Sequence, residues 1–387
     1  MKITDLKTTI VHVPFPKEFK PSWAPGFKQK TQGKILVEIF TDEGLVGFSG
    51  QTTHTGSGHV EAITIQEAVK PKLIGMDPFE TEKITKIVKG ARGHGARVGV
   101  VVAAIWDLIG KACSQPVYKL LGGWSNHLKV YASFGEIRTA EERQLNVQRI
   151  YDEGFKAVKL RFHHDDFKKD LEIIEAVRKT IGDKMEIMVD ANQAGSSNAI
   201  RGPRWTVNTA VKVAKELENY NVRWLEEPLD HEDIDGLRLL RSKVNIPIAG
   251  GEGSFTPFEF ENFLVNECYD IIQPDCVLTG GILEVKKIAA LAEARNRECI
   301  PHAWASGIGL IADAHVIASC SNASYLEYPY DPPSLTTDAF FGIINEKVQV
   351  DEEGYITLPE GPGLGVSLDR DIIDKYGYTV NVERSFQ

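Results

Sequence analysis

The first third of the chain alternates hydrophobic and polar positions before it changes to a helical spacing. Alternation covers residues 3–13 and 33–41, and Asp42-Glu43-Gly44 supplies a turn before residues 45–48. A two-residue period places one face of each stretch on a core, so this segment predicts antiparallel strands. Apolar residues then recur at helical spacing in residues 60–73, 81–88 and 98–109. The pattern predicts an α+β unit that ends near residues 120–123.

From about Lys129 onward, short β-branched runs alternate with longer amphipathic stretches. The runs cover residues 130–134, 157–162, 186–190, 222–226, 246–250, 271–274, 298–301 and 325–327. Helical spacing fills the segments between them, as in residues 170–181, 207–217 and 283–294. Strand–helix alternation is typical of a parallel sheet, and eight repeats favour a closed barrel over an open doubly wound sheet. We therefore predict an α/β fold built on a (β/α)8, TIM-like barrel.

Composition and charge narrow the classes of function. The chain has 387 residues and a formal net charge of -10, with acidic residues spread along its length. A phosphate backbone needs a basic surface, so we expect no nucleic-acid partner. No apolar run approaches the roughly 20 residues that cross a bilayer, and the N-terminus lacks a secretory signal. We therefore expect no membrane contact. The five cysteines are scattered without a C-x-x-C pair, so we expect a cytoplasmic protein without disulfides or structural zinc.

Polar side chains stand at the C-terminal end of nearly every predicted barrel strand. They are Ser133, Lys159, Arg161, Asp190, Asn192, Glu226, Glu227, Glu252, Asp275, His302 and Glu327. Residues from different strands converge at that end of a barrel, and active sites are built there. Solvation alone would place polar residues at both ends. The pattern therefore predicts an active site at the C-terminal edge.

Three carboxylates on successive strands, Asp190, Glu226 and Glu252, predict a metal site. Converging carboxylates repel one another unless a cation or a proton holds them together. An all-oxygen site with room for water and substrate suits Mg²⁺. The alternative is that each carboxylate pairs with its own arginine or lysine.

Two further pairs have spacings that suit catalysis. Lys159 and Arg161 are two residues apart, so on a strand both point into the barrel mouth, where they would hold an anionic substrate. A structural salt bridge to Asp190 or Glu226 is the alternative reading. Asp275 and His302 end adjacent strands, and a carboxylate that fixes one imidazole nitrogen leaves the other free for proton transfer. A lone histidine is more often a core residue, but the neighbouring acid favours the pair. Glu327 could hydrogen-bond at a developing charge.

These residues stand in motifs that together resemble the enolase superfamily, and within it the mandelate racemase-like subgroup. The motifs are Gly154-Phe155-Lys156-Ala157-Val158-Lys159, Val189-Asp190-Ala191-Asn192, Trp224-Leu225-Glu226-Glu227-Pro228, Gly250-Gly251-Glu252, Gln273-Pro274-Asp275 and Pro301-His302-Ala303-Trp304. The resemblance covers essentially the whole chain. It implies an α+β capping domain (residues 1–125), a catalytic barrel (126–335) and a C-terminal segment (336–387) that packs back on the cap. It also implies a homo-oligomer.

The resemblance further implies a mechanism, since superfamily sites are an established case of a lysine or histidine base that works with Mg²⁺. Asp190, Glu226 and Glu252 would bind Mg²⁺, and the metal would chelate the carboxylate of a small-molecule substrate. Lys159 would help to neutralise the enediolate. His302 with Asp275 would be the base on one face, and Glu327 would hydrogen-bond to a carboxylate oxygen.

Arg161 departs from the subgroup pattern. The racemases of the subgroup carry a second lysine at this position, which acts as the base on the face opposite the histidine. A guanidinium stays protonated and is a poor proton acceptor. We therefore expect a one-base reaction: dehydration of a sugar acid, an aldonate or an aldarate, to a 2-keto-3-deoxy acid. An epimerase or racemase, or a lactone cycloisomerase, would use the same intermediate. A barrel that only binds a sugar acid is disfavoured because the carboxylates and the His302–Asp275 pair are retained.

Substrate choice is assigned to loops around this edge. In the family, cap regions corresponding to residues 23–27 and 53–58 cover the pocket, which makes Trp23 and His54 candidate substrate contacts. Asn192 and Glu227, directly beyond two strand ends, are further candidates. Residues 194–203 look like an inserted loop that brings Arg201 to the catalytic face or to a neighbouring subunit.

Overall fold

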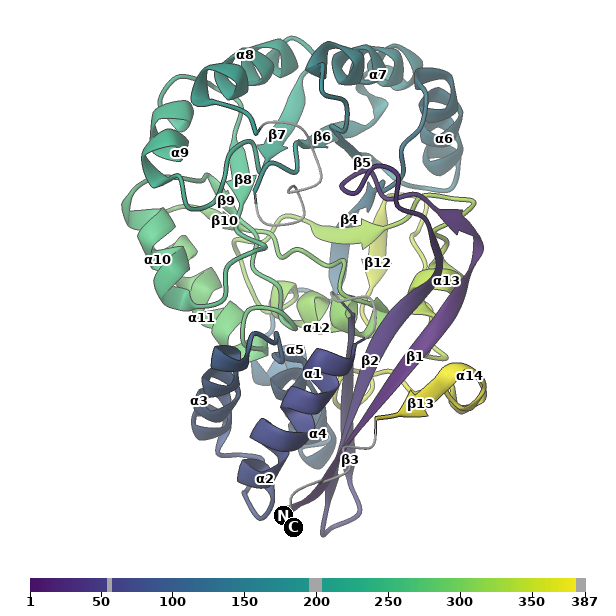
Figure 1. Ribbon diagram of the computed structural model, residues 1–387, viewed down its shortest axis with the longest axis vertical. Coiled ribbons are helices and arrows are strands. Elements are labelled where there is room, and N and C mark those ends of the chain that lie inside the picture. Colours follow the sequence, from purple (N-terminus) through teal and green to yellow (C-terminus); the bar gives the residue numbers. More distant parts are fainter. Residues whose placement is uncertain (54–57, 195–203, 381–387) are drawn as a thin grey trace.

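The cap is an antiparallel sheet with helices on one side (Figure 1). The computed structural model describes residues 1–53, 58–194 and 204–380. The sheet order is β13-β1-β2-β3, from strands β1 (Ile3–Phe19), β2 (Gln29–Thr41), β3 (Val46–Thr52) and β13 (Gly377–Thr379). The strands predicted from alternation are confirmed, but β1 and β2 are longer because their ladder continues to Phe19 and Gln29. Their hairpin therefore carries the chain around Trp23 up to the barrel.

The cap helices confirm the predicted helical stretches, with one interruption. They are α1 (His59–Thr64), the π-helical η1 (Ile65–Val69), α2 (Lys70–Leu73), α3 (Thr81–Ala91), the 3₁₀ turn η2 (Arg92–His94), α4 (Val100–Ala112) and α5 (Val117–Leu120). The stretch predicted as one helix over residues 60–73 passes through a π-helical turn next to Pro71. Proline has no backbone N–H to donate, so the regular i→i−4 ladder cannot run through it.

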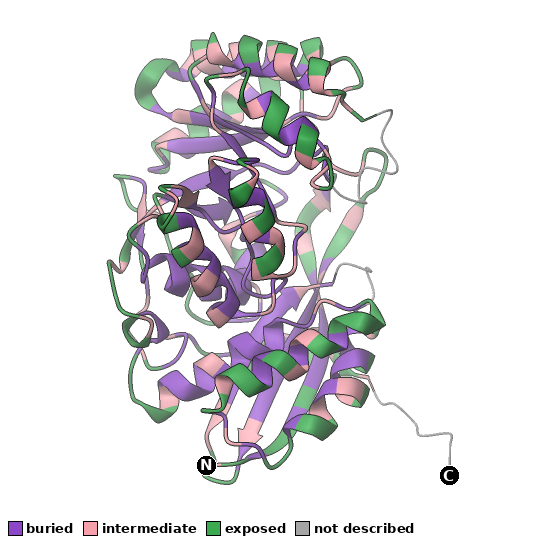
Figure 2. Ribbon diagram, turned by 90° about the vertical axis from the view of Figure 1, so that its left-hand side faces the viewer, coloured by how far each residue is buried: buried purple, intermediate pink, exposed green. Residues whose placement is uncertain are grey.

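Eight parallel strands curl into a TIM-like barrel in the order β10-β9-β8-β7-β6-β5-β4-β11. The strands are β4 (His127–Ser133), β5 (Ala157–Arg161), β6 (Glu186–Asp190), β7 (Val222–Glu226), β8 (Ile248–Gly250), β9 (Ile271–Ile272), β10 (Glu298–Cys299) and β11 (Leu326–Pro329). The helices between them are α6 (Ala140–Asp152), α7 (Phe167–Ile181), α8 (Val207–Glu218), α9 (Ile234–Arg241), α10 (Pro257–Val265), α11 (Ile282–Glu293) and α12 (Gly307–Ile317). Figure 2 shows buried strands inside helices whose outer faces are exposed.

The barrel closes by contacts other than a strand ladder. Within the described ranges, no ladder joins β10 to β11. The backbone N–H of Cys299 instead donates to the carbonyl of Asn322 (2.9 Å), and the N–H of Ala303 donates to Oε2 of Glu327 (2.9 Å). The predicted barrel is therefore confirmed as a curled eight-stranded sheet whose last two strands meet through their flanking residues.

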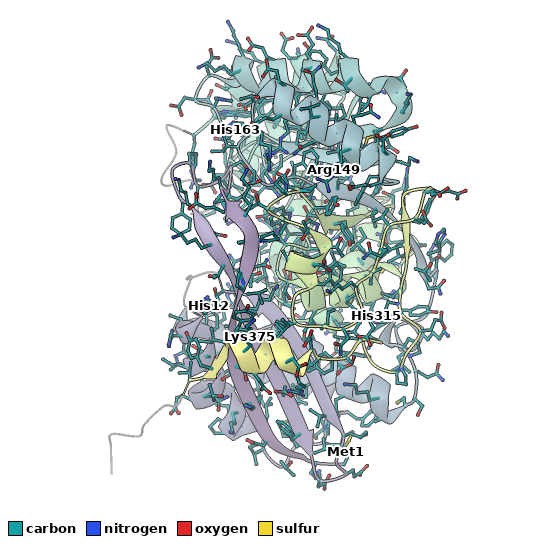
Figure 3. The ribbon with its side chains drawn as sticks, turned by 90° about the vertical axis from the view of Figure 1, so that its right-hand side faces the viewer. Met1, His12, Arg149, His163, His315 and Lys375 are labelled. Atoms are coloured by element: carbon teal, nitrogen blue, oxygen red, sulfur yellow. The ribbon has the colours of Figure 1, made fainter. Side chains whose placement is uncertain are left out.

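The C-terminal segment joins both parts of the molecule. Strand β12 (Tyr355–Thr357) pairs antiparallel with the start of β4, and β13 pairs with β1 of the cap. Helix α13 (Thr337–Phe341) follows the last barrel strand, and α14 (Arg370–Tyr376), which carries Lys375, lies beside the cap sheet (Figure 3). Where barrel and cap meet, Nδ1 of His315 on α12 accepts a hydrogen bond from the N–H of Tyr118 (3.1 Å). No helix of the described chain is long and apolar enough to cross a membrane.

Candidate active site

A layer of apolar side chains inside the barrel determines where the polar layer lies. One buried cluster holds a residue from each of the eight strands or their edges: Tyr131, Ala157, Met188, Trp224, Ala249, Ile271, Ile300 and Tyr325. Side chains two residues apart on a strand share a face, so the next inward layer is fixed. In seven cases it is Ser133, Lys159, Asp190, Glu226, Gln273, His302 and Glu327. The C-terminal edge is therefore polar because each strand turns from apolar to polar at the same height.

On strand β8 the corresponding position of the polar layer is occupied by a glycine. The residue two positions beyond Ala249 is Gly251, whose φ is +117°, and a Cβ there would lie 2.7 Å from the ring of Phe260. Only glycine fits this conformation and space. The turn lets the following residue, Glu252, supply the carboxylate on this strand, and its side chain is 29% exposed.

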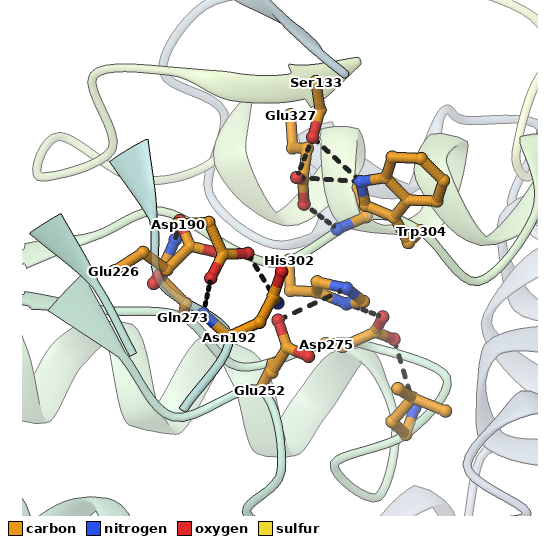
Figure 4. Close-up of polar contacts among 12 residues, drawn as sticks. Ser133, Asp190, Asn192, Glu226, Glu252, Gln273, Asp275, His302, Trp304 and Glu327 are labelled. Carbon is orange, nitrogen blue, oxygen red and sulfur yellow. Dashed lines mark hydrogen bonds and ion pairs between the residues drawn. The ribbon is translucent and has the colours of Figure 1, made fainter. Parts of the chain in front are cut away.

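Asp190, Glu226 and Glu252 face the same part of the barrel mouth (Figure 4). Asp190 and Glu226 are register partners on β6 and β7, and both are buried. Burial raises the pKa of Asp190, and Glu252 adds to this, although Arg161 and Lys159 oppose it. Burial likewise raises the pKa of Glu226, against Lys159. A raised carboxyl pKa marks negative charge that the surroundings do not fully compensate.

The donor set of this site fits a hard divalent cation. The carboxylates around the mouth are those of Asp190, Glu226, Glu227, Glu252, Asp275 and Glu327, and they outnumber the cationic groups that contact them, which are Lys159, Arg161 and His302. Oxygen ligands and excess negative charge are what Mg²⁺ prefers. The three candidate ligands do not all lie within 4.8 Å of one another here. In the described part of the chain, one His/Cys/Asp/Glu group meets that distance: His163, His164 and Asp170.

Two of the three carboxylates also pair with a cation. Nη1 of Arg161 lies 2.5 Å from Oδ2 of Asp190, and Nζ of Lys159 lies 2.6 Å from Oε1 of Glu226. This is the salt-bridge alternative that the sequence left open for both cations. Burial acts to lower the pKa of Lys159, but Glu226 and Glu327 outweigh it and raise the pKa above its ordinary value. Lys159 is therefore a fixed positive charge.

Glu327 is held in one orientation by several donors. Its Oε1 lies 2.7 Å from Nζ of Lys159 and accepts hydrogen bonds from Oγ of Ser133 (2.7 Å) and Nε1 of Trp304 (3.0 Å). Burial acts to raise the pKa of Glu327, but Lys159, His302 and Arg161 lower it to about 2. Glu327 is thus a carboxylate with an unusually rigid position.

His302 and Asp275 form the predicted pair. Nδ1 of His302 lies 2.9 Å from Oδ2 of Asp275, and Nε2 lies 3.5 Å from Oε2 of Glu252. The other oxygen of Asp275 accepts the backbone N–H of Val277 (2.9 Å), which fixes the carboxylate. Burial acts to lower the pKa of His302, but Glu252, Asp275 and Glu327 raise it to about 10. Nε2 is the imidazole nitrogen that points toward the candidate metal ligands.

Asn192 and Glu227 lie where two strands leave the barrel, and both have left-handed backbone conformations. Their φ angles are +47° and +44°, which is uncommon for residues with a side chain. The N–H of Asn192 donates to Oδ1 of Asp190 (2.7 Å), and its Oδ1 accepts from Arg161 (3.2 Å). Burial raises the pKa of Glu227 well above its ordinary value, and Glu252 and Asp190 add to this. Strained backbone of this kind clusters at functional sites.

The cap places Trp23, a substrate contact implied by the family resemblance, at the barrel mouth. Its ring meets Trp304 edge-on at a centroid distance of 5.1 Å. The guanidinium of Arg161 lies 5.0 Å from each of these two rings, and its Nε donates to the carbonyl of Phe134 (2.8 Å). His54 and Arg201, the other two predicted substrate contacts, lie outside the described residues.

Three participants were not assigned a role from the sequence. Gln273 donates to Oε2 of Glu226 (2.8 Å), and Ser133 and Trp304 hold Glu327. Gln273 stands two residues before Asp275, and Ser133 ends the first barrel strand, so the two-residue period could have identified both. Trp304 lies beyond a strand end, where no period applies.

Two family models match this chain. The mandelate racemase / muconate lactonizing enzyme N-terminal domain matches residues 6–122, and the enolase C-terminal domain-like model matches residues 142–372. The chain belongs to the enolase superfamily, in its mandelate racemase/muconate lactonizing enzyme subgroup. It is therefore an enzyme of the superfamily whose members share metal-dependent removal of the proton next to a carboxylate.

Individual members of the superfamily resemble this chain over most of its length. It is 30% identical to arabinonate dehydratase of Saccharolobus solfataricus, over 88% of this chain and 90% of that protein. It is also 30% identical to D-galactarolactone cycloisomerase of Agrobacterium fabrum, over 97% and 99%. The structure of a racemase from Streptomyces coelicolor A3(2), solved with bound magnesium, superposes with a TM-score of 0.84 at 26% identity, covering 97% and 100%.

Proposed function

We propose that this enzyme dehydrates a sugar acid, an aldonate or an aldarate, to a 2-keto-3-deoxy acid. The observation that carries the proposal is Arg161, at the position where the racemases of the subgroup carry a second base. Its guanidinium pairs with Asp190, donates to the carbonyl of Phe134 and lies beside two tryptophans. A guanidinium in these contacts cannot take a proton from carbon. A reaction with a single base, His302, is the one that these residues support.

In the proposed mechanism Asp190, Glu226 and Glu252 would hold Mg²⁺. When bound, Mg²⁺ would neutralise the substrate carboxylate and offset the carboxylate charges that raise the pKa of His302. Nε2 of His302 would then take the α-proton, while Asp275 holds Nδ1 and so fixes the ring and its tautomer. The same nitrogen would return a proton to the departing β-hydroxyl.

Lys159 and Glu327 would act on the charge that develops when the proton leaves. The ammonium of Lys159 is buried and already charged, so it can stabilise a developing oxyanion without first having to be protonated. Glu327 is held by Ser133, Trp304 and the N–H of Ala303, and it would keep the Lys159 ammonium in place beside the developing charge. Trp23 would close the mouth from the cap.

A cycloisomerase is the second candidate, and the full-length similarity to D-galactarolactone cycloisomerase favours it. Both reactions begin with removal of the α-proton. They differ in the bond that breaks afterwards: the β-hydroxyl departs in the dehydratase, and a lactone ring opens in the cycloisomerase. The two are separated by incubating the Mg²⁺-loaded enzyme with a library of aldonic, aldaric and lactone substrates in D₂O. Formation of a 2-keto acid from one or a few acids is the expected result. Deuterium at the α-carbon without keto acid would instead support an isomerase. If no substrate gave either keto acid or α-deuteration, the proposal would be refuted.

Three further properties stay proposals. We propose division of the chain at residues 125/126 and 335/336, with the last segment packed on the cap, which the pairing of β13 with β1 supports. We propose a cytoplasmic location, which the five free cysteines support. We also propose a homo-oligomer, which the family resemblance supports, without membrane or nucleic-acid partners; the acidic net charge disfavours nucleic acid.

A further inference from the structure

A cavity of about 220 Å³ lies between the cap and two loops of the barrel mouth. Its cap side runs from the end of α3 to the start of α4, and its barrel side is made by the loops after β8 and β9. The lining residues that matter here are Arg92, Arg97, Val98, Phe255 and Leu278. The two sides are in tight contact, because a Cβ on Gly99 would lie 2.8 Å from the carbonyl oxygen of Val277. The cavity is therefore a fixed feature of the cap–barrel junction.

Lys89, Arg92 and Arg97 line the cavity, and Arg97 is the one without a paired carboxylate in the described part of the chain; Lys89 lies 2.7 Å from Glu284. The guanidinium carbon of Arg97 lies 4.5 Å from the ring centroid of Phe255, and Arg92 lies 4.8 Å from the same ring. Arg92 is 3.6 Å from Glu259. Within the described ranges, no carboxylate oxygen lies within 4.0 Å of the Arg97 guanidinium, although it is half-buried. A guanidinium stacked on an aromatic ring keeps its fork of N–H donors oriented and available.

The loops that line the cavity are those that carry the candidate active site. Phe255 follows Glu252 by three residues, and the N–H of Leu278 donates to Oδ1 of Asp275 (3.2 Å). Oγ1 of Thr279 donates to the carbonyl of Ser254 (3.0 Å), which ties the two loops together. Burial lowers the pKa of Arg97, and the carboxylates of Glu252, Asp275 and Glu227 oppose this, so the guanidinium lies within their field.

We propose that Arg97 makes this cavity a binding site for a carboxylate group. The chemistry fits, since an oriented guanidinium bonds a carboxylate with two parallel N–H···O contacts, and apolar walls such as Val98 and Leu278 reduce competition from water. The group has two sources. One is the distal carboxylate of an aldarate whose first carboxylate occupies the active site, and this source rests on the proposed function. The other is a separate small dicarboxylic acid.

The test is binding, measured by isothermal titration calorimetry with Mg²⁺ present and with every protein in the His302→Asn background, so that no probe is turned over during the titration. Matched probes are galactarate against galactonate and glucarate against gluconate, which differ only in the distal carboxylate, and succinate as a separate acid. The proteins compared are the otherwise unchanged chain, Arg97→Gln and Glu252→Gln, with Arg238→Gln on the exposed surface of α9 as control. Circular dichroism checks that each variant is folded.

If the distal carboxylate occupies the cavity, Arg97→Gln weakens binding of a diacid by roughly tenfold to a hundredfold and leaves its monoacid within about twofold. If a separate acid occupies it, succinate binds even to Glu252→Gln, and Arg97→Gln abolishes that binding. Equal weakening of diacid and monoacid, or no change for any probe, would overturn the inference. Keto-acid formation is read separately, so failure of this inference and failure of the dehydratase proposal give different results.

Discussion

Replacing Lys159 with methionine tests the central electrostatic feature of the barrel mouth. Nζ of Lys159 lies 2.6 Å from Glu226 and 2.7 Å from Glu327, and all three side chains are at most 1% exposed. Methionine keeps most of the volume but removes the charge. It therefore leaves two buried carboxylates without their shared cation.

The size of the effect follows from these distances. At an effective dielectric constant of about 20, each contact contributes about 6 kcal/mol of Coulomb attraction. Most of this is offset by the cost of burying the three charges, but removing one partner exposes that cost. We expect Lys159→Met to lower the free energy of unfolding by about 3–5 kcal/mol. Proton removal from substrate should also slow by at least about a hundredfold, as is typical when a preorganised charge is lost.

Urea unfolding of both proteins, repeated between pH 7 and pH 3, measures the loss and its origin. The folded-state pKa of Glu327 is about 2 and its ordinary value is 4.5, so its ion pair stabilises the fold fully above about pH 4.5. That contribution is lost as pH falls toward 2, and the difference between wild type and variant should narrow with it.

A matched control lies at the other end of the same barrel. Lys129 on β4 pairs with Glu186 at 2.8 Å, but the two side chains are 31% and 40% exposed. Lys129→Met should therefore cost less than about 1 kcal/mol. Equal losses in the two variants, or a Lys159→Met loss that does not shrink in acid, would refute the reasoning.

Three further predictions concern the base, the metal and a buried lysine. His302→Asn should reduce α-proton exchange with D₂O by about a hundredfold or more, with Mg²⁺ affinity nearly unchanged; retained exchange, followed by NMR, would assign the base elsewhere. Glu252→Gln should raise the Mg²⁺ concentration needed for half-maximal activity at least tenfold, and an unchanged Mg²⁺ titration would remove Glu252 from the ligands. Lys34 donates hydrogen bonds to the carbonyls of Ala339 (3.2 Å) and Phe340 (3.0 Å), and burial lowers its pKa to about 7. Because the unfolded chain then binds more protons than the folded one, stability should rise from about pH 7 to pH 10 by at most about 4 kcal/mol. Lys34→Met should lack that rise in urea unfolding, and a rise equal to that of the wild type would contradict the assignment.

The sequence was sufficient for the order of elements and for most of the candidate site. Strand–helix alternation from Lys129 onward specified the barrel, because each apolar run must be buried on both faces between helices. The two-residue period of the strands then placed five side chains at the C-terminal edge of the barrel, since inward positions repeat every two residues. They are Lys159, Asp190, Glu226, His302 and Glu327. Family motifs agreed with this placement, and the matches to both domains confirm the family.

Tertiary structure alone decided how these charges are paired. Nothing in the spacing of Lys159 and Arg161 says that one lies against Glu226 and Glu327 and the other against Asp190, because such choices depend on side-chain reach across neighbouring strands. The same holds for Trp23, which reaches Arg161 from a hairpin more than a hundred residues away. It holds also for Arg97, whose place beside Phe255 comes from the docking of the cap on the barrel. Periodicity is a local property that fixes which way a side chain points. Contacts between elements depend on how those elements pack in three dimensions, and no local pattern encodes that packing.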